Sequence, residues 1–435
     1  MARLDYIDFT VHVPTVTADQ VLWAPRVTPT TGVRIVKNLP HFFWADGRPW
    51  LEGNLWASRQ VDRILSGELK LKTIQTSALA IHAYMQFLEA EEIDWWHFPP
   101  EREKRCLIRY RGFLIKCRTE GKITASTTSS RMSTVISFYR WIRAEHLLTT
   151  AIQPFSERVV GIRVQDTSGF RRTIGVTTTD LAIPNRGRSA SDLEDGLLPV
   201  SLEERNRILA FAELHCSEEL YLMLALGFGT GMRLGSITDL KIRTLLAAQP
   251  DSHTDKLHYL TIGPGVKYAP VHTKFDVDGQ VIIPTILLER LQVYVNSPRR
   301  LKREAAASGE AKHIVFLNRY GKPFSRGEDG RSPSVNTEMT RLRCKARTEG
   351  LNLDNFKFHR SRATFATSIA DTAISMSGAS SVGNIVQLIR DLLLHKDEAT
   401  SMRYIKFVRN QKVKAQWANE FTRLFVGAAM SSDNA

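Results

Sequence analysis

Hydrophobic residues between about positions 70 and 147 recur with the period of a helix. In LKTIQTSALAIHAYMQFLEAE, the residues Leu79, Ile81, His82, Met85 and Leu88 fall near helical spacing. The stretches EREKRCLIRYRGFLIKCRTEG and TTSSRMSTVISFYRWIRAEHLL continue the pattern, with Lys and Arg between the apolar positions. The pattern predicts a small helical domain over residues 66–150. Its basic faces fit a phosphate backbone, and they fit the solvated surface of a bundle equally well.

The segments on either side lack this period. Residues 1–65 mix Trp and Pro with short strand-like runs, and no function follows from them. Residues 151–197 hold a Thr-rich patch and end in the polar stretch IPNRGRSASDLEDG, which has the composition of a linker. We therefore expect residues 151–197 to be a linker, with a domain boundary near 190–198.

A second domain is expected over residues 198–412, followed by a C-terminal helix or tail over 413–435. The domain begins with a helix in which Ser201 and Glu204 have the spacing of a capping box. Strand-like pieces occur in LHYLTIG, PVHTKF and QVIIP, and the turn DVDG separates the last two. Most of the remainder has helical character. The expected fold class is therefore mainly α with a small antiparallel β-sheet (α+β).

Length and composition narrow the classes of function. A chain of 435 residues predicts two or three domains. A net charge of +14 favours an acidic partner, most often nucleic acid, over a basic surface kept only for solubility. The chain has no run of about 18 apolar residues, and its start lacks the apolar core of a signal peptide, so we expect a cytoplasmic protein without a membrane partner. Four scattered cysteines without a CxxC pair indicate neither a zinc site nor a disulfide framework.

Three short stretches carry candidate chemistry, and each is weak alone. GFGTGMRLGSITDL has several glycines but matches no phosphate-loop pattern, and it presents Arg233 after a tight turn. In FKFHRSRATFATSIA, His359 and Arg362 share one face of a helix, and His359 lacks the second ligand that a helical metal motif requires. In LLLHKDEATSMRYIK, Tyr404 follows His395 by nine residues.

Together with Lys274 on the predicted hairpin, these residues form a set that fits one task. Arginine forks bind the non-bridging oxygens of a phosphodiester. A tyrosine can attack phosphorus as a covalent nucleophile, and His and Lys can move the protons. The combination points to phosphoryl transfer on nucleic acid.

The three stretches, in this order, resemble the boxes of the tyrosine recombinase (phage integrase) family. TGMRLGSITDL is similar to the first box, HRSRATFAT to the second and LLLHKDEATSMRY to the third, with the same nine-residue step from His to Tyr. The resemblance covers roughly residues 198–410, and the helical segment at 70–147 occupies the place of the family's core DNA-binding domain.

The resemblance implies a role for each of six residues. Arg233 and Arg362 would clamp the scissile phosphate, Lys274 would protonate the leaving 5′ oxygen, His359 would assist proton transfer, His395 would hydrogen-bond a phosphate oxygen, and Tyr404 would attack phosphorus. It also implies a 3′-phosphotyrosine intermediate that keeps the energy of the broken ester. Neither a metal nor another cofactor, and no ATP, is then expected.

The sequence departs from the family pattern near the first arginine and before the second histidine. Three positions after Arg233, where the family has an acidic residue, stands Ser236, and we expect Asp239 to give some of the missing support. The residue before His395 is Leu394 instead of glycine.

The chain also contains an insertion before His395 and two candidates for the lysine of the site. Between Thr367 and His395 the chain is about ten residues longer than is usual in the family, through DTAISMSGASSVGN, which we expect to form a loop at the rim of the site. Lys267 lies on the same predicted sheet as Lys274. Lys274 is preferred because, as in the resembling family, it stands just before a turn (DVDG) and a strand that ends in Pro.

The function implied by the resemblance is a site-specific recombinase or integrase of a mobile element. It would act on double-stranded DNA as a homo-tetramer through a Holliday junction, and accessory DNA-bending proteins or a partner recombinase are compatible with it. The alternatives are a type IB topoisomerase and a catalytically silent DNA-binding regulator. In the tail, Val413, Trp417, Phe421 and Leu424 form an apolar stripe, which either packs on its own domain or, as we favour, docks on a neighbouring protomer.

Overall fold

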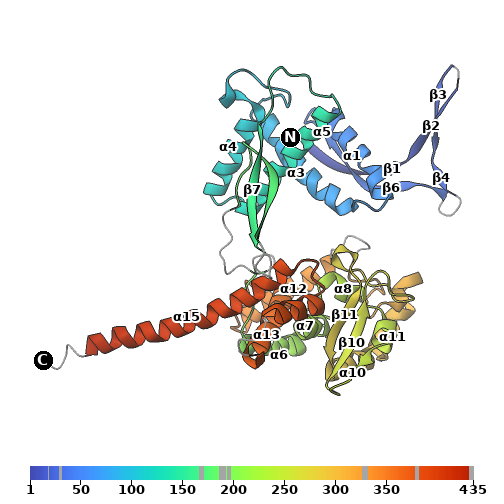
Figure 1. The fold of residues 1–435 in the computed structure, drawn as a ribbon. Coiled ribbons are helices and arrows are strands. Elements are labelled where there is room, and N and C mark those ends of the chain that lie inside the picture. Colours follow the sequence, from blue (N-terminus) through green and yellow to red (C-terminus); the bar gives the residue numbers. More distant parts are fainter. Residues whose placement is uncertain are drawn as a thin grey trace. The chain divides into compact units, whose positions relative to one another are not determined.

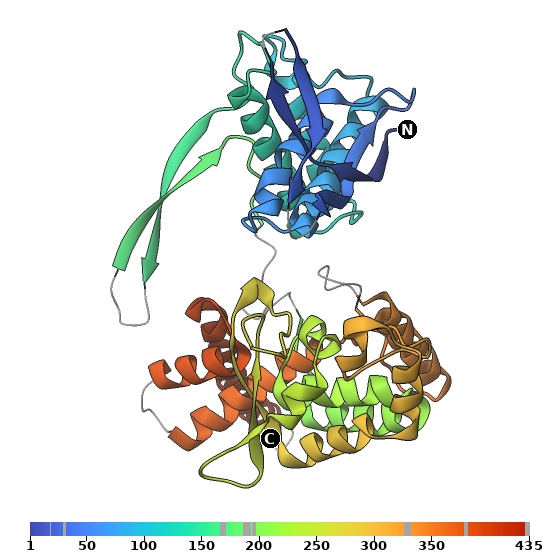
Figure 2. The same ribbon diagram turned by 90° about the vertical axis from the view of Figure 1, so that its right-hand side faces the viewer.

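The computed structural model describes residues 1–17, 19–28, 32–165, 171–185, 193, 197–325, 332–377 and 382–430. The chain divides into two compact units, Met1–Gly187 and Arg188–Ala435 (Figures 1 and 2). Each unit combines helices with small antiparallel sheets, so the expected fold class is confirmed. None of the helices in the described residues is long and apolar enough to span a bilayer.

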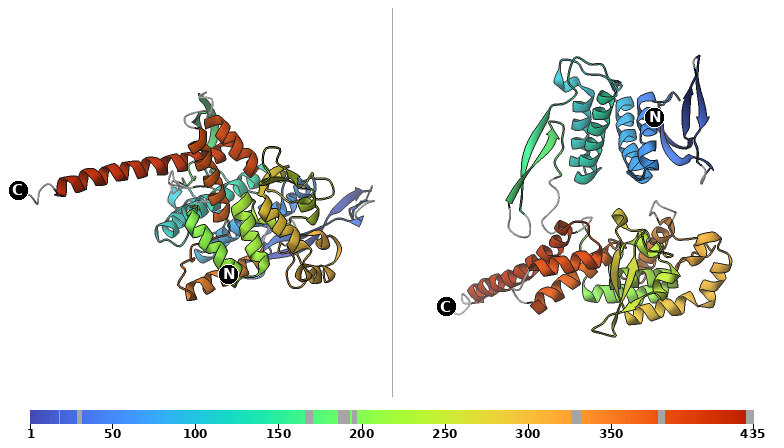
Figure 3. Two further views of the ribbon diagram at one scale, coloured as in Figure 1. Left: turned by 90° about the horizontal axis from the view of Figure 1, so that it is seen from below. Right: turned by 45° about the vertical axis from the view of Figure 1, so that its right-hand side comes forward.

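A helical bundle forms the core of the first unit (Figure 3). It consists of α1 (Leu51–Arg59), α2 (Val61–Leu65), α3 (Leu71–Ala90), α4 (Cys106–Thr119) and α5 (Ala125–Ala144), with the 3₁₀ turn η1 (Arg102–Lys104) before α4. The side chain of Thr124 caps α5 by accepting a hydrogen bond from the backbone N–H of Thr127. The helices expected between 70 and 147 are therefore present, and the helical part begins earlier, at Leu51.

The strands of the first unit form two-stranded antiparallel pairs. They are β1 (Arg3–Thr10) with β6 (Ile35–Phe43), β2 (His12–Val16) with β3 (Val21–Pro25), β4 (Val27–Thr28) with β5 (Gly32–Val33), and β7 (Glu157–Gln165) with β8 (Arg171–Thr179). The pair β7–β8 lies inside residues 151–197, which we expected to be a linker. Its Val and Thr residues favour extended backbone, so the Thr-rich patch forms a ribbon.

The second unit packs its helices around a three-stranded antiparallel sheet with the order β11-β10-β9. The strands are β9 (Gln249–Pro250), β10 (Leu257–Ile262) and β11 (Gly279–Pro284). The helices are α6 (Leu202–His215), α7 (Glu218–Thr230), α8 (Leu234–Thr238), α9 (Ile242–Leu246), α10 (Thr285–Val295), α11 (Pro298–Ala305), α12 (Pro333–Thr348), α13 (Arg360–Ser377), α14 (Val382–Leu393) and α15 (Glu398–Met430), with 3₁₀ turns η3 (Lys274–Asp276) and η4 (Gly309–His313). The expected capping by Ser201 is present, since its Oγ accepts from the backbone N–H of Glu204 at 3.0 Å.

The prediction of a strand in PVHTKF is wrong. β10 pairs with β11 directly, with Leu257 opposite Pro284, and PVHTKF forms a loop that leads into η3. Phe275 and Asp276 have φ values of 67° and 54°, and Thr273 Oγ1 donates to the carbonyl of Val277 at 2.8 Å. The chain therefore turns tightly immediately after position 273, and Lys274 lies on this turn instead of on a strand.

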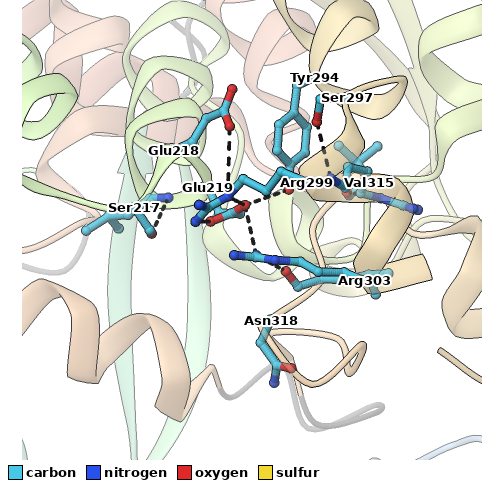
Figure 4. Close-up of polar contacts among 12 residues, drawn as sticks. Ser217, Glu218, Glu219, Tyr294, Ser297, Arg299, Arg303, Val315 and Asn318 are labelled. Carbon is cyan, nitrogen blue, oxygen red and sulfur yellow. Dashed lines mark hydrogen bonds and ion pairs between the residues drawn. The ribbon is translucent and has the colours of Figure 1, made fainter. Parts of the chain in front are cut away.

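A buried ion network fixes the beginning of α7 (Figure 4). Glu219, in the first turn of this helix, is fully buried. Its carboxylate accepts hydrogen bonds from Tyr294 Oη at 3.1 Å and from Arg299 Nε at 2.8 Å, and it pairs with Arg303 at 2.8 Å. These partners come from α10 and α11, so the network locks α7 to both helices. The other end of α7 leads directly to Arg233.

Glu219→Ala should destabilise the second unit by about 3–5 kcal/mol, because removing one partner leaves buried guanidinium charge uncompensated. Glu218→Ala is the matched control. Glu218 is the exposed neighbour in the same helical turn, and its loss should cost less than about 1 kcal/mol. Unfolding in urea at neutral pH gives both values. Equal losses for the two variants would show that the network contributes nothing specific.

The same network predicts a pH dependence. Burial alone would raise the pKa of Glu219, but the hydrogen bond from Arg299 and the charges of Arg303 and Arg299 hold this pKa below its ordinary value of 4.5. A carboxyl whose pKa is lowered by folding adds stability above its unfolded pKa and loses it as the pH falls through the folded pKa. The stability gap between the wild type and Glu219→Gln should therefore narrow as the pH falls below 4.5.

Candidate active site

Arg362, near the start of α13, joins the three sequence motifs. Its side chain is buried, with 2% exposed. Nη1 donates to the carbonyl of Gly231 at 2.7 Å, and Nη2 donates to the carbonyl of Leu393 at 2.8 Å. Gly231 ends α7 and Leu393 ends α14, so one guanidinium connects stretches that are far apart in the sequence.

Gly231 turns the chain between α7 and the first arginine. It has a φ of 67°, in the left-handed region, and its backbone N–H bonds back to the carbonyl of Gly227. A Cβ at this position would lie 2.4 Å from Phe365 Cδ1 and 2.7 Å from Leu393 Cδ2. Only glycine fits both the conformation and the space. The turn places Arg233 at the N-cap position of α8.

A small pocket brings three cationic side chains together. Arg233, Lys274 and Arg362 all line it, and they come from the start of α8, from η3 and from α13. Leu393 and Leu394, just before His395, complete one side. None of the described residues that line the pocket is acidic. Such a pocket suits an anion with several oxygens, because arginine forks and a lysine can meet different oxygens at once.

His395 and Tyr404 form the second part of the site. Their rings are stacked, with centroids 5.9 Å apart and planes inclined by 8°. The Nδ1 atom of His395 lies 2.9 Å from Ser401 Oγ, one turn before Tyr404 on α15. Both residues are buried, and Tyr404 is fully so. The nine-residue step therefore places the two side chains next to each other, with the ring of Tyr404 inside the core.

The two lysine candidates differ in position. Lys274 is exposed at the turn and lines the pocket of the arginines. Lys267 is not among the residues that line this pocket, and its Nζ lies 5.0 Å from the centre of the Tyr268 ring. This position favours Lys274 over Lys267 as the lysine of the site.

Ser236 and Asp239 hold the loop that precedes Lys274. Ser236 Oγ donates to the carbonyl of His272 at 2.8 Å. Asp239 accepts from the backbone N–H of His272 at 2.7 Å and from Lys241 Nζ at 2.6 Å. The two side chains thus hydrogen-bond to the backbone carbonyl and to the backbone N–H of the same residue, His272. The serine that departs from the family pattern therefore has a structural role beside the site.

Leu394 occupies a conformation that favours glycine. Its φ is 50°, in the left-handed region, which glycine adopts readily and leucine adopts only with strain. The leucine side chain packs against the core of the second unit, and its Cδ2 would lie 2.4 Å from a Cβ at Gly279. Packing of the leucine and the absence of a side chain at residue 279 together offset the backbone strain.

His359 and the insertion before His395 differ from what the sequence predicted. His359 is half-buried directly before α13 and is not among the residues that line the pocket. Within the insertion, residues 371–377 extend α13 and residues 382–384 begin α14, so these parts are helical instead of a loop. The part of the insertion between them lies outside the described residues. Sequence reasoning missed Ser401, because a serine one turn before a tyrosine has no distinctive signal.

Gly231→Ala should lower the free energy of unfolding by more than about 2 kcal/mol, since it adds left-handed backbone strain and a clash with Phe365 and Leu393. Gly383→Ala is the control. Residue 383 lies within α14 with no atom within 4 Å of an added Cβ, so alanine should raise stability by up to about 1 kcal/mol. Denaturant unfolding of both variants measures the difference. A neutral effect of Gly231→Ala would show that the turn tolerates a side chain.

No family model and no curated protein sequence matches the chain. Among solved structures, the chain is similar to XerA recombinase, with 16% identity, 82% of this chain and 97% of that chain covered, and a TM-score of 0.32. A Tn1549 transposon integrase in complex with a circular intermediate DNA has 13% identity, coverages of 81% and 94%, and a TM-score of 0.48. A lambda integrase dimer bound to a COC′ core site has 18% identity, coverages of 81% and 77%, and a TM-score of 0.43. These three solved structures are a recombinase and two integrases.

Proposed function

We propose that the protein is a tyrosine site-specific recombinase that cleaves and rejoins double-stranded DNA. The observation that carries this proposal is the pocket in which Arg233, Lys274 and Arg362 converge. The pocket adjoins the segment that leads to the stacked pair of His395 and Tyr404. A phosphate site next to a tyrosine is what phosphoryl transfer to that tyrosine requires.

In this proposal the arginines bind the two non-bridging oxygens of the scissile phosphate. Negative charge grows on these oxygens in the pentacoordinate transition state, so contacts made there lower the barrier. Arg362 is held by two backbone carbonyls before DNA arrives. Its guanidinium therefore loses little side-chain entropy on binding, which favours fast chemistry.

The covalent step joins Tyr404 to the DNA strand. Tyr404 Oη forms a bond to phosphorus, and the bond from phosphorus to the 5′ oxygen breaks. Lys274 gives a proton to that leaving oxygen, and His359 assists removal of the tyrosine proton. His395 donates a hydrogen bond to a phosphate oxygen. In the reverse direction a 5′ hydroxyl of a partner strand attacks the 3′-phosphotyrosine, which restores Tyr404 without ATP, a metal or another cofactor.

Burial of Tyr404 adds a condition to this mechanism. With its side chain fully inside the core, the tyrosine cannot meet a phosphodiester in the described conformation. Residues 394–397, between α14 and α15, must therefore allow the first turns of α15 to move when DNA binds. Arg390 on α14 pairs with Glu398 at 3.1 Å, and this contact would loosen with the movement.

The domain roles follow from the same proposal. Residues 66–150 form the core DNA-binding domain and residues 198–412 the catalytic domain, and the high positive charge of the chain serves contact with phosphates. Four copies act together through a Holliday junction in the cytoplasm to integrate or excise a mobile element, with accessory DNA-bending proteins or a partner recombinase where the site requires them.

Tyr404→Phe should abolish covalent attachment to DNA and leave DNA binding near normal, because only the attacking oxygen is lost. The assay is an SDS-resistant protein–DNA adduct on nicked duplexes made from the DNA that flanks the coding sequence. Tyr268→Phe, at an exposed tyrosine of the same unit, is the control and should keep the adduct. An undiminished adduct with Tyr404→Phe would mean that another residue is the nucleophile.

The tail of α15 supports assembly between copies. Val413 and Trp417 are 62% and 66% exposed, so most of the surface of both side chains remains accessible to another copy. The side chains of Phe421 and Leu424 lie outside the described part. We infer that the stripe docks on a neighbouring protomer.

Truncation after residue 410 should therefore leave the melting temperature nearly unchanged, since it removes exposed side chains and a surface ion pair between Lys412 and Asp371. Pairing of two DNA sites in a native gel should be lost, while single-site binding persists. Trp417→Ala should reproduce the assembly defect, and Lys414→Ala should not. A large fall in melting temperature would place the stripe in the truncated protein's own core.

A further inference from the structure

The first unit has an open surface pocket of about 930 Å³, which shares no residue with the candidate active site. It lies where the turn after β6 meets the start of α1, the last turn of α3 and the loop at residues 92–96. Figure 1 labels β6, α1 and α3. The volume of the pocket is in the range of pockets that bind ligands. We call it the tryptophan pocket.

Four tryptophans line this pocket and contact one another in a row. The ring centroids of Trp44 and Trp50 are 5.2 Å apart, those of Trp50 and Trp95 are 6.4 Å apart, and those of Trp95 and Trp96 are 5.3 Å apart. Trp50 and Trp95 belong to the core, whereas Trp44 is half-buried and Trp96 is 53% exposed. The faces of aromatic rings carry partial negative charge, so this wall attracts cations as well as apolar groups.

Five carboxylates also line the pocket, together with the Arg48 side chain and Met1, which carries the N-terminal amino group, and some of these groups already have partners. Asp46 and Arg48 pair with each other at 2.6 Å. Glu89 accepts hydrogen bonds from the backbone N–H groups of Ala2 and Ala45. These contacts are structural and hold the turn after β6 against the end of α3.

The other three carboxylates are Glu52, Glu92 and Asp94. The described part of the chain gives none of them an ion-pair partner, although all three line the pocket. The last turn of α3, residues 86–90, also faces the pocket and contains no basic residue, so the negative end of a 20-residue helix adds to the field. The N-terminus of α1 carries partial positive charge, and the carboxylate of Glu52 in the first turn offsets this charge.

This combination selects one class of ligand. DNA is repelled by unpaired carboxylates, so the pocket is not part of the phosphate-binding surface. The described residues hold no cluster of three His, Cys, Asp or Glu side chains suited to a metal ion. The complement of tryptophan faces beside carboxylates is an organic cation with apolar surface, and three separate carboxylates accommodate more than one positive group.

We propose that the tryptophan pocket binds a segment of a partner protein in which arginine or lysine stands next to an aliphatic or aromatic side chain. The cationic groups pair with Glu52, Glu92 and Asp94, and the apolar side chain packs between Trp44 and Trp96. Because the pocket repels DNA, such a partner can remain bound while the protein holds its DNA. The inference uses only residues of the first unit and stands apart from the proposed chemistry.

The test is a selection of displayed random peptides on the full-length protein. Enriched peptides should carry arginine or lysine beside an apolar residue. Their affinity should fall by at least roughly tenfold, or about 1.4 kcal/mol, with the triple variant Glu52→Gln, Glu92→Gln, Asp94→Asn. The control variant Glu101→Gln, Glu103→Gln, Glu120→Gln removes the same charge from exposed positions of the same unit outside the pocket, and should bind as the wild type does.

Trp96→Ala gives a second readout that does not alter the charge. This half-exposed residue can be removed with little change in melting temperature, and peptide affinity should still fall by at least roughly tenfold. Enriched peptides without cationic residues, or equal binding to both triple variants, would overturn the proposal. So would weaker DNA binding or altered self-association of the pocket variant, since these results would place DNA or a second copy in the pocket.

Discussion

The hydrogen bonds of Arg362 are the constraint on which the second unit's site depends. A guanidinium cannot lose its charge in a protein, and burying it is costly unless its donors are satisfied. Here the carbonyls of Gly231 and Leu393 satisfy two donors at 2.7 and 2.8 Å. Both carbonyls are at helix ends, where they lack intrahelical hydrogen-bond donors. The Arg362 side chain therefore supplies the missing donors at the ends of two helices. The same contacts bring the ends of α7 and α14 to the start of α13.

This arrangement separates a rigid part of the site from a movable part. Arg233 lies at the start of α8, which packs in the main core of the second unit, and α7 is fixed at its far end by the ion network of Glu219. Arg362 is held by its hydrogen bonds to the carbonyls of Gly231 and Leu393. Tyr404 belongs to a smaller cluster with α13 and α14 and is covered. Electrostatic stabilisation gains most from groups that do not reorganise, whereas a covalent nucleophile can be withheld until substrate is in place. In the proposed mechanism the protein thus combines a preformed phosphate pocket with a buried tyrosine.

The sequence predicted the parts of this site that depend on residue type and spacing. His395 and Tyr404, nine residues apart, form a stacked pair, and the two motif arginines line one pocket. Each of these four residues lies near the end of a helix, and the helices show clear hydrophobic periodicity in the sequence. Lys274 was placed on a strand but lies on a turn, since the positive φ values of Phe275 and Asp276 leave no mark in hydrophobic periodicity. The pair β7–β8 was not predicted because its Val and Thr residues lie among linker-like polar residues. The tryptophan pocket depends on tertiary contacts between residues 44–52 and 86–96, and no local pattern could reveal it.

The central claim is that Tyr404, hidden next to His395, becomes covalently attached to DNA at the arginine pocket. The most direct measurement is peptide mapping of the protein–DNA adduct by tandem mass spectrometry after nuclease and protease digestion. The account predicts that the remaining nucleotide is attached, through its 3′ phosphate, to the peptide that contains Tyr404. A nucleotide on any other residue, or attachment through a 5′ phosphate, would contradict it.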